Sequence, residues 1–76
     1  MTNRLPSLRP KDVVRALERA GFVVARRSGS HCRLIHQSDP TRKVTLPIHS
    51  EDLKRGTLRA IIAQAGFTVA EFIALL

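Results

Sequence analysis

A histidine beside a cluster of arginines is the clearest chemical signal in this sequence. His31 directly follows the segment 28–30, whose sequence is Ser-Gly-Ser. Three arginines surround it: Arg26, Arg27 and Arg33. Histidine takes up and releases a proton near neutral pH, and guanidinium groups bind phosphate well. An acid/base group on an anion-binding surface predicts a protein that cleaves RNA rather than one that only binds it.

Metal-free cleavage of RNA needs no nucleophile from the protein, because the 2′-hydroxyl next to each phosphate can attack it. The protein must remove that proton, donate one to the leaving 5′-oxygen and stabilise charge on the phosphate. We predict that His31 carries part of this work, with arginines or water doing the rest. Gly29 allows a close backbone approach and a positive φ, and Ser30 offers a hydroxyl and an amide. Spacing alone leaves a second interpretation open, in which 28–30 is only a hairpin turn.

Two further histidines and one cysteine are weaker candidates. His49 follows Pro47 and is a second acid/base group, a cap for the next helix or, as we favour, a loop histidine that fixes backbone geometry. His36 is predicted to be a solvated surface residue. Cys32 is predicted to be a small buried hydrophobe, because alternation along a strand puts it on the opposite face from its neighbour His31.

A second basic cluster begins the last third of the chain: Lys54, Arg55 and Arg59. Cations at a helix N-terminus form a phosphate site, although charge runs also form ordinary solvated faces. Gly56 within this turn predicts a close approach to a strand or a ligand. The three phenylalanines fit the core, so contact with the RNA backbone rather than base stacking is expected. The predicted RNA-binding set is Arg26, Arg27, Ser28, Gly29, Ser30, Arg33, Lys54, Arg55 and Arg59.

Composition narrows the class of protein. The chain has 76 residues, enough for one domain over residues 1–76. Thirteen Lys and Arg against six Asp and Glu give a net charge of +7. Such an excess favours a polyanionic partner: nucleic acid, an anionic membrane or an acidic protein.

Several classes are not expected. A single cysteine makes no internal disulfide and, with three scattered histidines, lacks the paired spacing of a zinc site. No apolar run reaches the length of a membrane span, and the first residues lack a signal-peptide core. The expected protein is cytoplasmic, with no metal, cofactor or membrane partner.

The elements that must position these side chains follow from periodicity and turn residues. After an irregular lead over 1–8, apolar spacing predicts a helix at about 10–20, with Pro10 in its first turn and Gly21 as its stop. Three strands are predicted at 22–27, 31–36 and 42–47, joined by turns at 28–30 and 37–41. A loop over 48–52 leads to a helix at about 55–65. Thr68 and Glu71 match a capping box before a short third helix.

This order, α-β-β-β-α with a short terminal helix, predicts an α+β fold. Three sequential strands with tight connections form a three-stranded antiparallel sheet. The helices are expected to cover one face of the sheet and leave the other in water. The same order is found in double-stranded-RNA-binding domains.

Six segments spread over nearly the whole chain form a recognisable set. They are LERAGF at 17–22, RSGSH at 27–31, VTLPIH at 44–49 and LKRGTLRAI at 53–61, followed by QAGF at 64–67 and EF at 71–72. Together and in this order they resemble the HicA (YcfA-like) toxins of bacterial toxin–antitoxin modules. Cys32 stands where the family often has an aliphatic residue or a second histidine. Arg9 and Pro10 stand at the start of the first helix, where the family commonly has Ser-Gly. This difference affects only the capping of that helix.

The resemblance implies a double-stranded-RNA-binding fold and a metal-independent endoribonuclease, an mRNA interferase that arrests growth. It implies that His31 is the catalytic residue. It also implies a HicB-type antitoxin that covers the active face, with DNA bound only indirectly, through the antitoxin complex. The alternatives are a non-catalytic RNA-binding module of the same fold and, more distantly, a basic domain whose only partner is an acidic protein.

Overall fold

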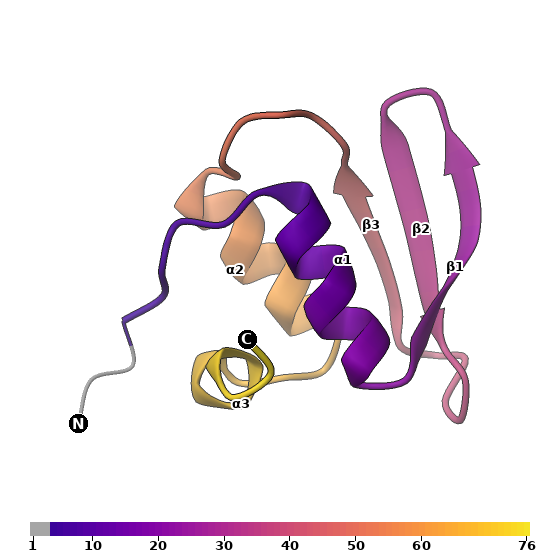
Figure 1. Ribbon diagram of the computed structural model, residues 1–76. Coiled ribbons are helices and arrows are strands. Elements are labelled where there is room, and N and C mark those ends of the chain that lie inside the picture. Colours follow the sequence, from indigo (N-terminus) through magenta and orange to yellow (C-terminus); the bar gives the residue numbers. More distant parts are fainter. Residues whose placement is uncertain (1–3) are drawn as a thin grey trace.

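The computed structural model describes residues 4–76 and has six elements in the expected order (Figure 1). They are α1 Pro10–Arg19, β1 Phe22–Ser28, β2 His31–His36, β3 Lys43–Pro47, α2 Arg55–Gln64 and α3 Val69–Ile73. Each predicted element is present within about one residue of its expected bounds. One difference matters for the site: Ser28 belongs to β1, so the turn before His31 has only two residues. Residues 1–3 of the predicted lead lie outside the described residues.

The three strands form one antiparallel sheet in the order β1-β2-β3. Exposed and buried residues alternate along β2 and β3, because successive side chains of a strand point to opposite faces. Both longer helices lie on the same side of the sheet (Figure 1). The α+β architecture predicted from the sequence is therefore confirmed. The sheet surface that carries no helix is called the open face below.

A bulge in β1 sets which of its residues share a face. Val24 pairs with Leu34, but the next paired residue, Arg26, lies opposite Arg33, so Ala25 is the extra residue. A bulge shifts the alternation of a strand by one position. Arg26 therefore lies on the open face, beside Arg33, and not on the helix side.

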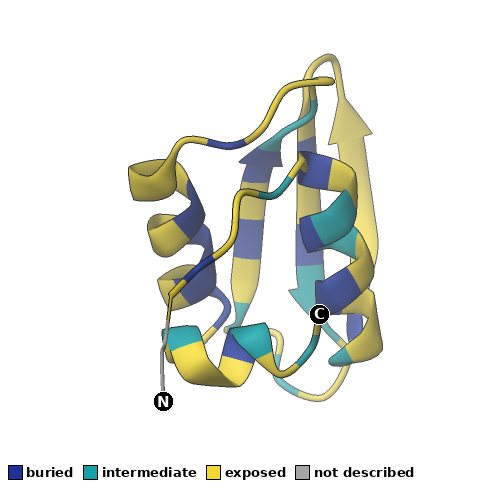
Figure 2. Ribbon diagram, turned by 60° about the vertical axis from the view of Figure 1, so that its left-hand side comes forward, coloured by how far each residue is buried: buried dark blue, intermediate teal, exposed yellow. Residues whose placement is uncertain are grey.

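The core lies between the sheet and the helices, and every element contributes to it. Phe22, Cys32 and Phe72 are almost fully buried, as the sequence predicts. Leu5 is also buried, and the N–H of Leu53 donates to the carbonyl of Leu8, so the lead is fixed against the loop before α2. Figure 2 shows the buried positions on the inner sides of the helices and sheet.

Local chemistry explains the helix ends. Pro10 is the first residue of α1, where its missing N–H leaves no bond unmade, and the Asp12 carboxylate accepts from the N–H of Arg9 at 3.1 Å. At α3, the Thr68 hydroxyl accepts from the N–H of Glu71 at 3.1 Å, and the Glu71 carboxylate accepts from the N–H of Thr68 at 2.8 Å. The capping box predicted from the sequence is confirmed.

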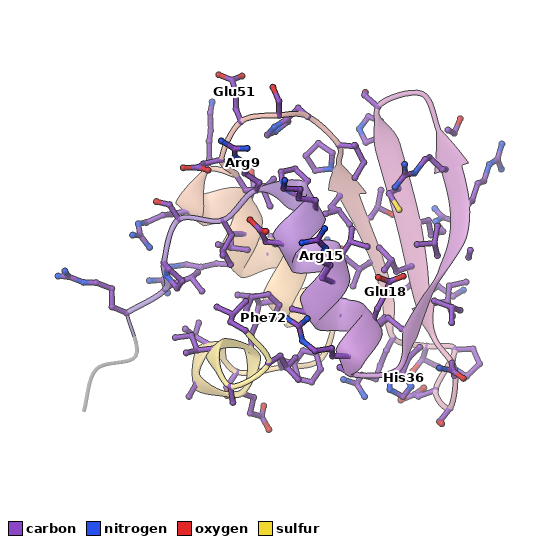
Figure 3. The ribbon with its side chains drawn as sticks, in the orientation of Figure 1. Arg9, Arg15, Glu18, His36, Glu51 and Phe72 are labelled. Atoms are coloured by element: carbon purple, nitrogen blue, oxygen red, sulfur yellow. The ribbon has the colours of Figure 1, made fainter. Side chains whose placement is uncertain are left out.

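His36 corrects one prediction, because it is a packed residue and not a solvated one. Its side chain is half-buried, and its ring meets Phe22 edge-on with centroids 5.0 Å apart. Nε2 donates to the carbonyl of Ala20 at 3.0 Å, while Nδ1 accepts from the N–H of Ser38 at 3.1 Å. The imidazole thus joins the end of α1 to the end of β2 (Figure 3). Gly21, at φ +99°, makes this possible, since a Cβ there would lie 3.1 Å from Nε2.

Arg42, in the connection before β3, makes a comparable bridge to the end of α2. Its guanidinium carbon lies 4.9 Å from the ring centre of Phe67 and 5.4 Å from that of Phe22. Its Nε donates to the carbonyl of Ala65 at 2.7 Å. Arg42 precedes β3 instead of opening it, and its charge is used to hold the end of α2 against the aromatic core.

Candidate active site

A hollow of about 200 Å³ lies on the open face and spans all three strands. Five side chains line it: Arg26, Ser28, His31, Arg33 and Thr45. All five are exposed. The hollow is called the His31 hollow below, and it brings four of the predicted site residues together with one, Thr45, that was not predicted.

Strand register places these side chains in two rows across the sheet. The first row is Ser28, His31 and Pro47, and the second is Arg26, Arg33 and Thr45. Side chains directly opposite each other on antiparallel strands have Cβ atoms about 4.5–5.5 Å apart. The imidazole therefore lies at the turn end of β2, one row away from two guanidinium groups, and a single phosphate can contact both rows.

The turn at the end of the hollow has the geometry that its glycine predicts. Gly29 has a φ of +57°, which L side chains rarely adopt, and a Cβ built there would meet nothing within 4 Å. The predicted positive φ is confirmed. The carbonyl of Ser30 accepts from the N–H of Ile48 at 2.6 Å, which fixes this turn to the end of β3. His31 is therefore held by hydrogen-bonded neighbours on both sides.

Charge in the His31 hollow is unbalanced. Arg26 and Arg33 lie directly opposite each other, an arrangement of like charges that destabilises a sheet. No carboxylate lines the hollow, and neither guanidinium has a hydrogen bond or an ion pair to any residue within 4–76. A phosphate between the two would remove the repulsion and receive charge-assisted hydrogen bonds.

Thr45 is the site residue that the sequence reasoning missed. It lies on β3 opposite Arg33, and its hydroxyl is the nearest neutral donor on that strand to the two arginines. Alternation alone would place Thr45 on one face with Lys43 and Pro47. Which residue of β2 it meets depends on the register set by the 37–42 connection, and the sequence pattern does not reveal that register.

Arg27 lies on the other side of β1 from the His31 hollow. It pairs with Cys32, whose side chain is buried against the helices. Its side chain lines a separate groove beside α1. The structure thus separates two arginines, Arg26 and Arg27, that the sequence analysis grouped together.

His49 is exposed in the loop after β3, and its Nδ1 accepts from the N–H of Glu51 at 3.2 Å. The cap residue of α2 is Lys54, and the hydrogen bond of the His49 ring goes to Glu51, which precedes that helix, so His49 does not cap it. Its contacts match the favoured prediction of a loop histidine that fixes backbone geometry. It lines a different hollow, with Lys54 and Thr57, and not the His31 hollow.

The second basic cluster is also separate from His31. Arg55 and Arg59 line a hollow with Arg4 and Leu5 on the helix side of the molecule. The guanidinium of Arg55 donates to the carbonyl of Leu5, so it fixes the lead to α2. No strand approaches Gly56, because a Cβ there would meet nothing within 4 Å, so of the close approaches predicted at this residue the one to a strand is wrong.

Within the described part of the chain, no three His, Cys, Asp or Glu side chains gather as a metal site would require. Nor is any described helix long and apolar enough to cross a bilayer. What the His31 hollow offers is one proton-transferring group, two unpaired cations and two hydroxyls. This set can bind a phosphodiester and transfer a proton beside it.

Comparison with known families gives one match. The family model described as the HicA toxin of bacterial toxin–antitoxin modules matches residues 10–67, from the first residue of α1 to the residue after Gly66. The matched range contains the whole sheet and every residue of the His31 hollow. No curated protein matches the chain.

Proposed function

Because the chain belongs to the HicA family of toxins from bacterial toxin–antitoxin modules, we propose that it is an endoribonuclease that cuts mRNA. His31 is its catalytic residue, and a HicB-type antitoxin keeps it inactive in the cytoplasm. The toxin contacts DNA only through that antitoxin. The observation that carries the proposal is the His31 hollow, where an exposed imidazole lies beside two unpaired guanidinium groups and no carboxylate.

Binding comes first in this mechanism. A phosphate seated over the second row receives hydrogen bonds from the guanidinium groups of Arg26 and Arg33. Thr45 and Ser28 donate from the two outer strands. These contacts are made to the phosphate backbone of the RNA and not to its bases, so the protein should bind RNA with little sequence preference.

Cleavage then uses the RNA as its own nucleophile. The 2′-oxygen forms a bond to phosphorus as it loses its proton, and the bond from phosphorus to the 5′-oxygen breaks as that oxygen gains a proton. The products are a 2′,3′-cyclic phosphate and a 5′-hydroxyl. His31 makes one of the two proton transfers and water makes the other, while Arg26 and Arg33 stabilise the negative charge that develops on the phosphate.

The decisive test replaces His31 with alanine and measures cleavage of an end-labelled RNA together with growth on induction. We expect cleavage to fall by about 10²–10⁴-fold, the usual contribution of a positioned acid/base group. RNA affinity and thermal unfolding should stay close to wild type. His49→Ala, which alters an exposed histidine outside the hollow, is the matched control and should cleave normally.

The alternative, a non-catalytic RNA-binding module, predicts that neither the wild type nor either variant cleaves the RNA and that all three affect growth alike. If purified His31→Ala protein cleaves RNA as well as the wild type, the assignment is wrong. Cleavage by the wild type is expected to persist in EDTA, and complete loss in the chelator would contradict the mechanism.

A further inference from the structure

The two edges of the sheet differ in what lies beside them. In the described residues β1 has a strand neighbour on one side only, and all of its residues after Phe22 are exposed (Figure 2). At the other edge, α2 packs beside β3, and the side-chain oxygen of Gln64 accepts from the N–H of Thr45 at 3.4 Å. Unpaired backbone groups on an edge strand are a template for an added strand. β1 offers such a template.

A groove runs along this open edge on the helix side. It has a volume of about 370 Å³ and lies between α1 and β1. Its lining residues are Lys11, Val14, Arg15, Glu18, Val24, Arg27 and Ile48. Figure 3 shows Arg15 and Glu18 projecting from α1, with Glu18 turned toward the strands. We call it the α1–β1 groove.

The groove has an apolar floor and a cationic rim. Val24 is 41% exposed, and with Val14 and Ile48 it leaves apolar surface in water. Lys11, Arg15 and Arg27 supply three positive charges against the single carboxylate of Glu18. Such a rim attracts an acidic partner, and such a floor accepts an apolar side chain.

We propose that an extended, acidic segment of the antitoxin adds a strand to the open edge of β1 and inserts an apolar side chain into the α1–β1 groove. RNA fits this place poorly, because its backbone has no apolar group to bury against the valines. A second copy of the toxin would bring the same cations into contact with each other. Charge therefore selects the antitoxin segment.

This inference rests on the antitoxin half of the proposed function and not on RNA cleavage. An added strand would lie beside Arg26 and Ser28, which form the margin of the His31 hollow. It would therefore narrow the approach of RNA from that side while occupying surface outside the hollow.

The test measures affinity between the antitoxin of the same module and His31→Ala toxin, which is expected to be harmless to the expressing cells. Val23 and Val24 are a matched pair: they are neighbours on β1, 45% and 41% exposed, but Val24 lines the groove and Val23 does not. Val24→Lys should weaken the complex by about 30-fold or more, as expected for a charge placed in a buried apolar contact. Val23→Lys should change the affinity less than about threefold.

A second measurement needs no variant in the groove. Amide hydrogen exchange of residues 23–27 should slow at least tenfold when the antitoxin binds, because strand addition protects the outer backbone groups of β1. Unchanged exchange there, equal effects of the two valine variants, or toxin self-association through this edge would each overturn the inference. If the wild type does not cleave RNA, the proposed catalysis is wrong, but the binding and exchange measurements still test strand addition at β1.

Discussion

Arg26 and Arg33 face each other on neighbouring strands, and this repulsion is the residue-scale signature of the site. Arg33→Gln removes it, so the folded protein should gain about 0.2–1 kcal/mol, the range for cross-strand pairs. The same change removes a charge-assisted hydrogen bond to phosphate, which is worth about 1.5–3 kcal/mol. We expect a higher urea midpoint together with a kcat/KM for RNA cleavage about 10- to 100-fold lower. A loss of stability with normal cleavage would contradict the phosphate site.

Thr45 tests the site from the opposite strand. Thr45→Val keeps the β-branched shape that suits a strand but removes the hydroxyl, so folding should be unaffected while KM for RNA rises about five- to tenfold. Thr45→Ser keeps the hydroxyl and should cleave like the wild type. Steady-state kinetics on a short RNA separate the two variants. Equal KM values for both would remove Thr45 from the site.

At the scale of elements, the junction of α1 and the sheet depends on a glycine. Gly21→Ala places a Cβ at φ +99° and 3.1 Å from Nε2 of His36. The unfavourable backbone and the displaced histidine should cost about 1–2 kcal/mol or more. Gly56→Ala is the matched control, because nothing lies near its Cβ and alanine favours a helix by about 0.5–1 kcal/mol. Thermal unfolding should rank Gly56→Ala above wild type and Gly21→Ala below it.

The capping box of α3 predicts how stability depends on pH. The backbone N–H of Thr68, and then its hydroxyl, hold the pKa of the Glu71 carboxyl below its usual value. A lowered pKa in the folded state means that this stabilisation is present in full above the ordinary glutamate pKa of about 4.3 and is lost as the pH falls below it. Thermal unfolding should be measured from about pH 6 down to about pH 3, a range that brackets the ordinary glutamate pKa. Over this range the unfolding temperature of the wild type should fall more steeply than that of Glu71→Gln. Parallel curves would show that Glu71 has no part in the acid response.

Periodicity predicted the elements well, because 3.6-residue spacing, alternation and turn residues are local properties of the chain. The residues that it misplaced depend on partners far away in sequence. His36 is packed because Gly21 leaves room for its ring, and Arg42 is held by the carbonyl of Ala65. Thr45 lies in the hollow because the register between β2 and β3 places it opposite Arg33. His31, Arg26 and Arg33 were predicted from residue type and position, and they line one hollow, whereas the separation of Arg27 from them needed the fold.

At the scale of the whole molecule, the fold is a thin slab with principal extents of 36 × 29 × 17 Å. One layer of helices and one sheet make the core, so a whole sheet face stays in contact with solvent. The net charge of +7 is carried by a chain of only 76 residues. A long polyanion can lie across such a face without entering a deep cleft.

The hydrogen bond between Gln64 and the backbone of Thr45 has a consequence for assembly. Filaments built by sheet extension need two complementary edges on every copy, so that each added unit exposes a template for the next. Here one backbone N–H of β3 is already bonded to a side chain, so a strand added at that edge would have to displace Gln64. The two edges are therefore unequal, and joining copies through β3 and β1 would cost this hydrogen bond, whereas a partner strand at β1 would leave it in place.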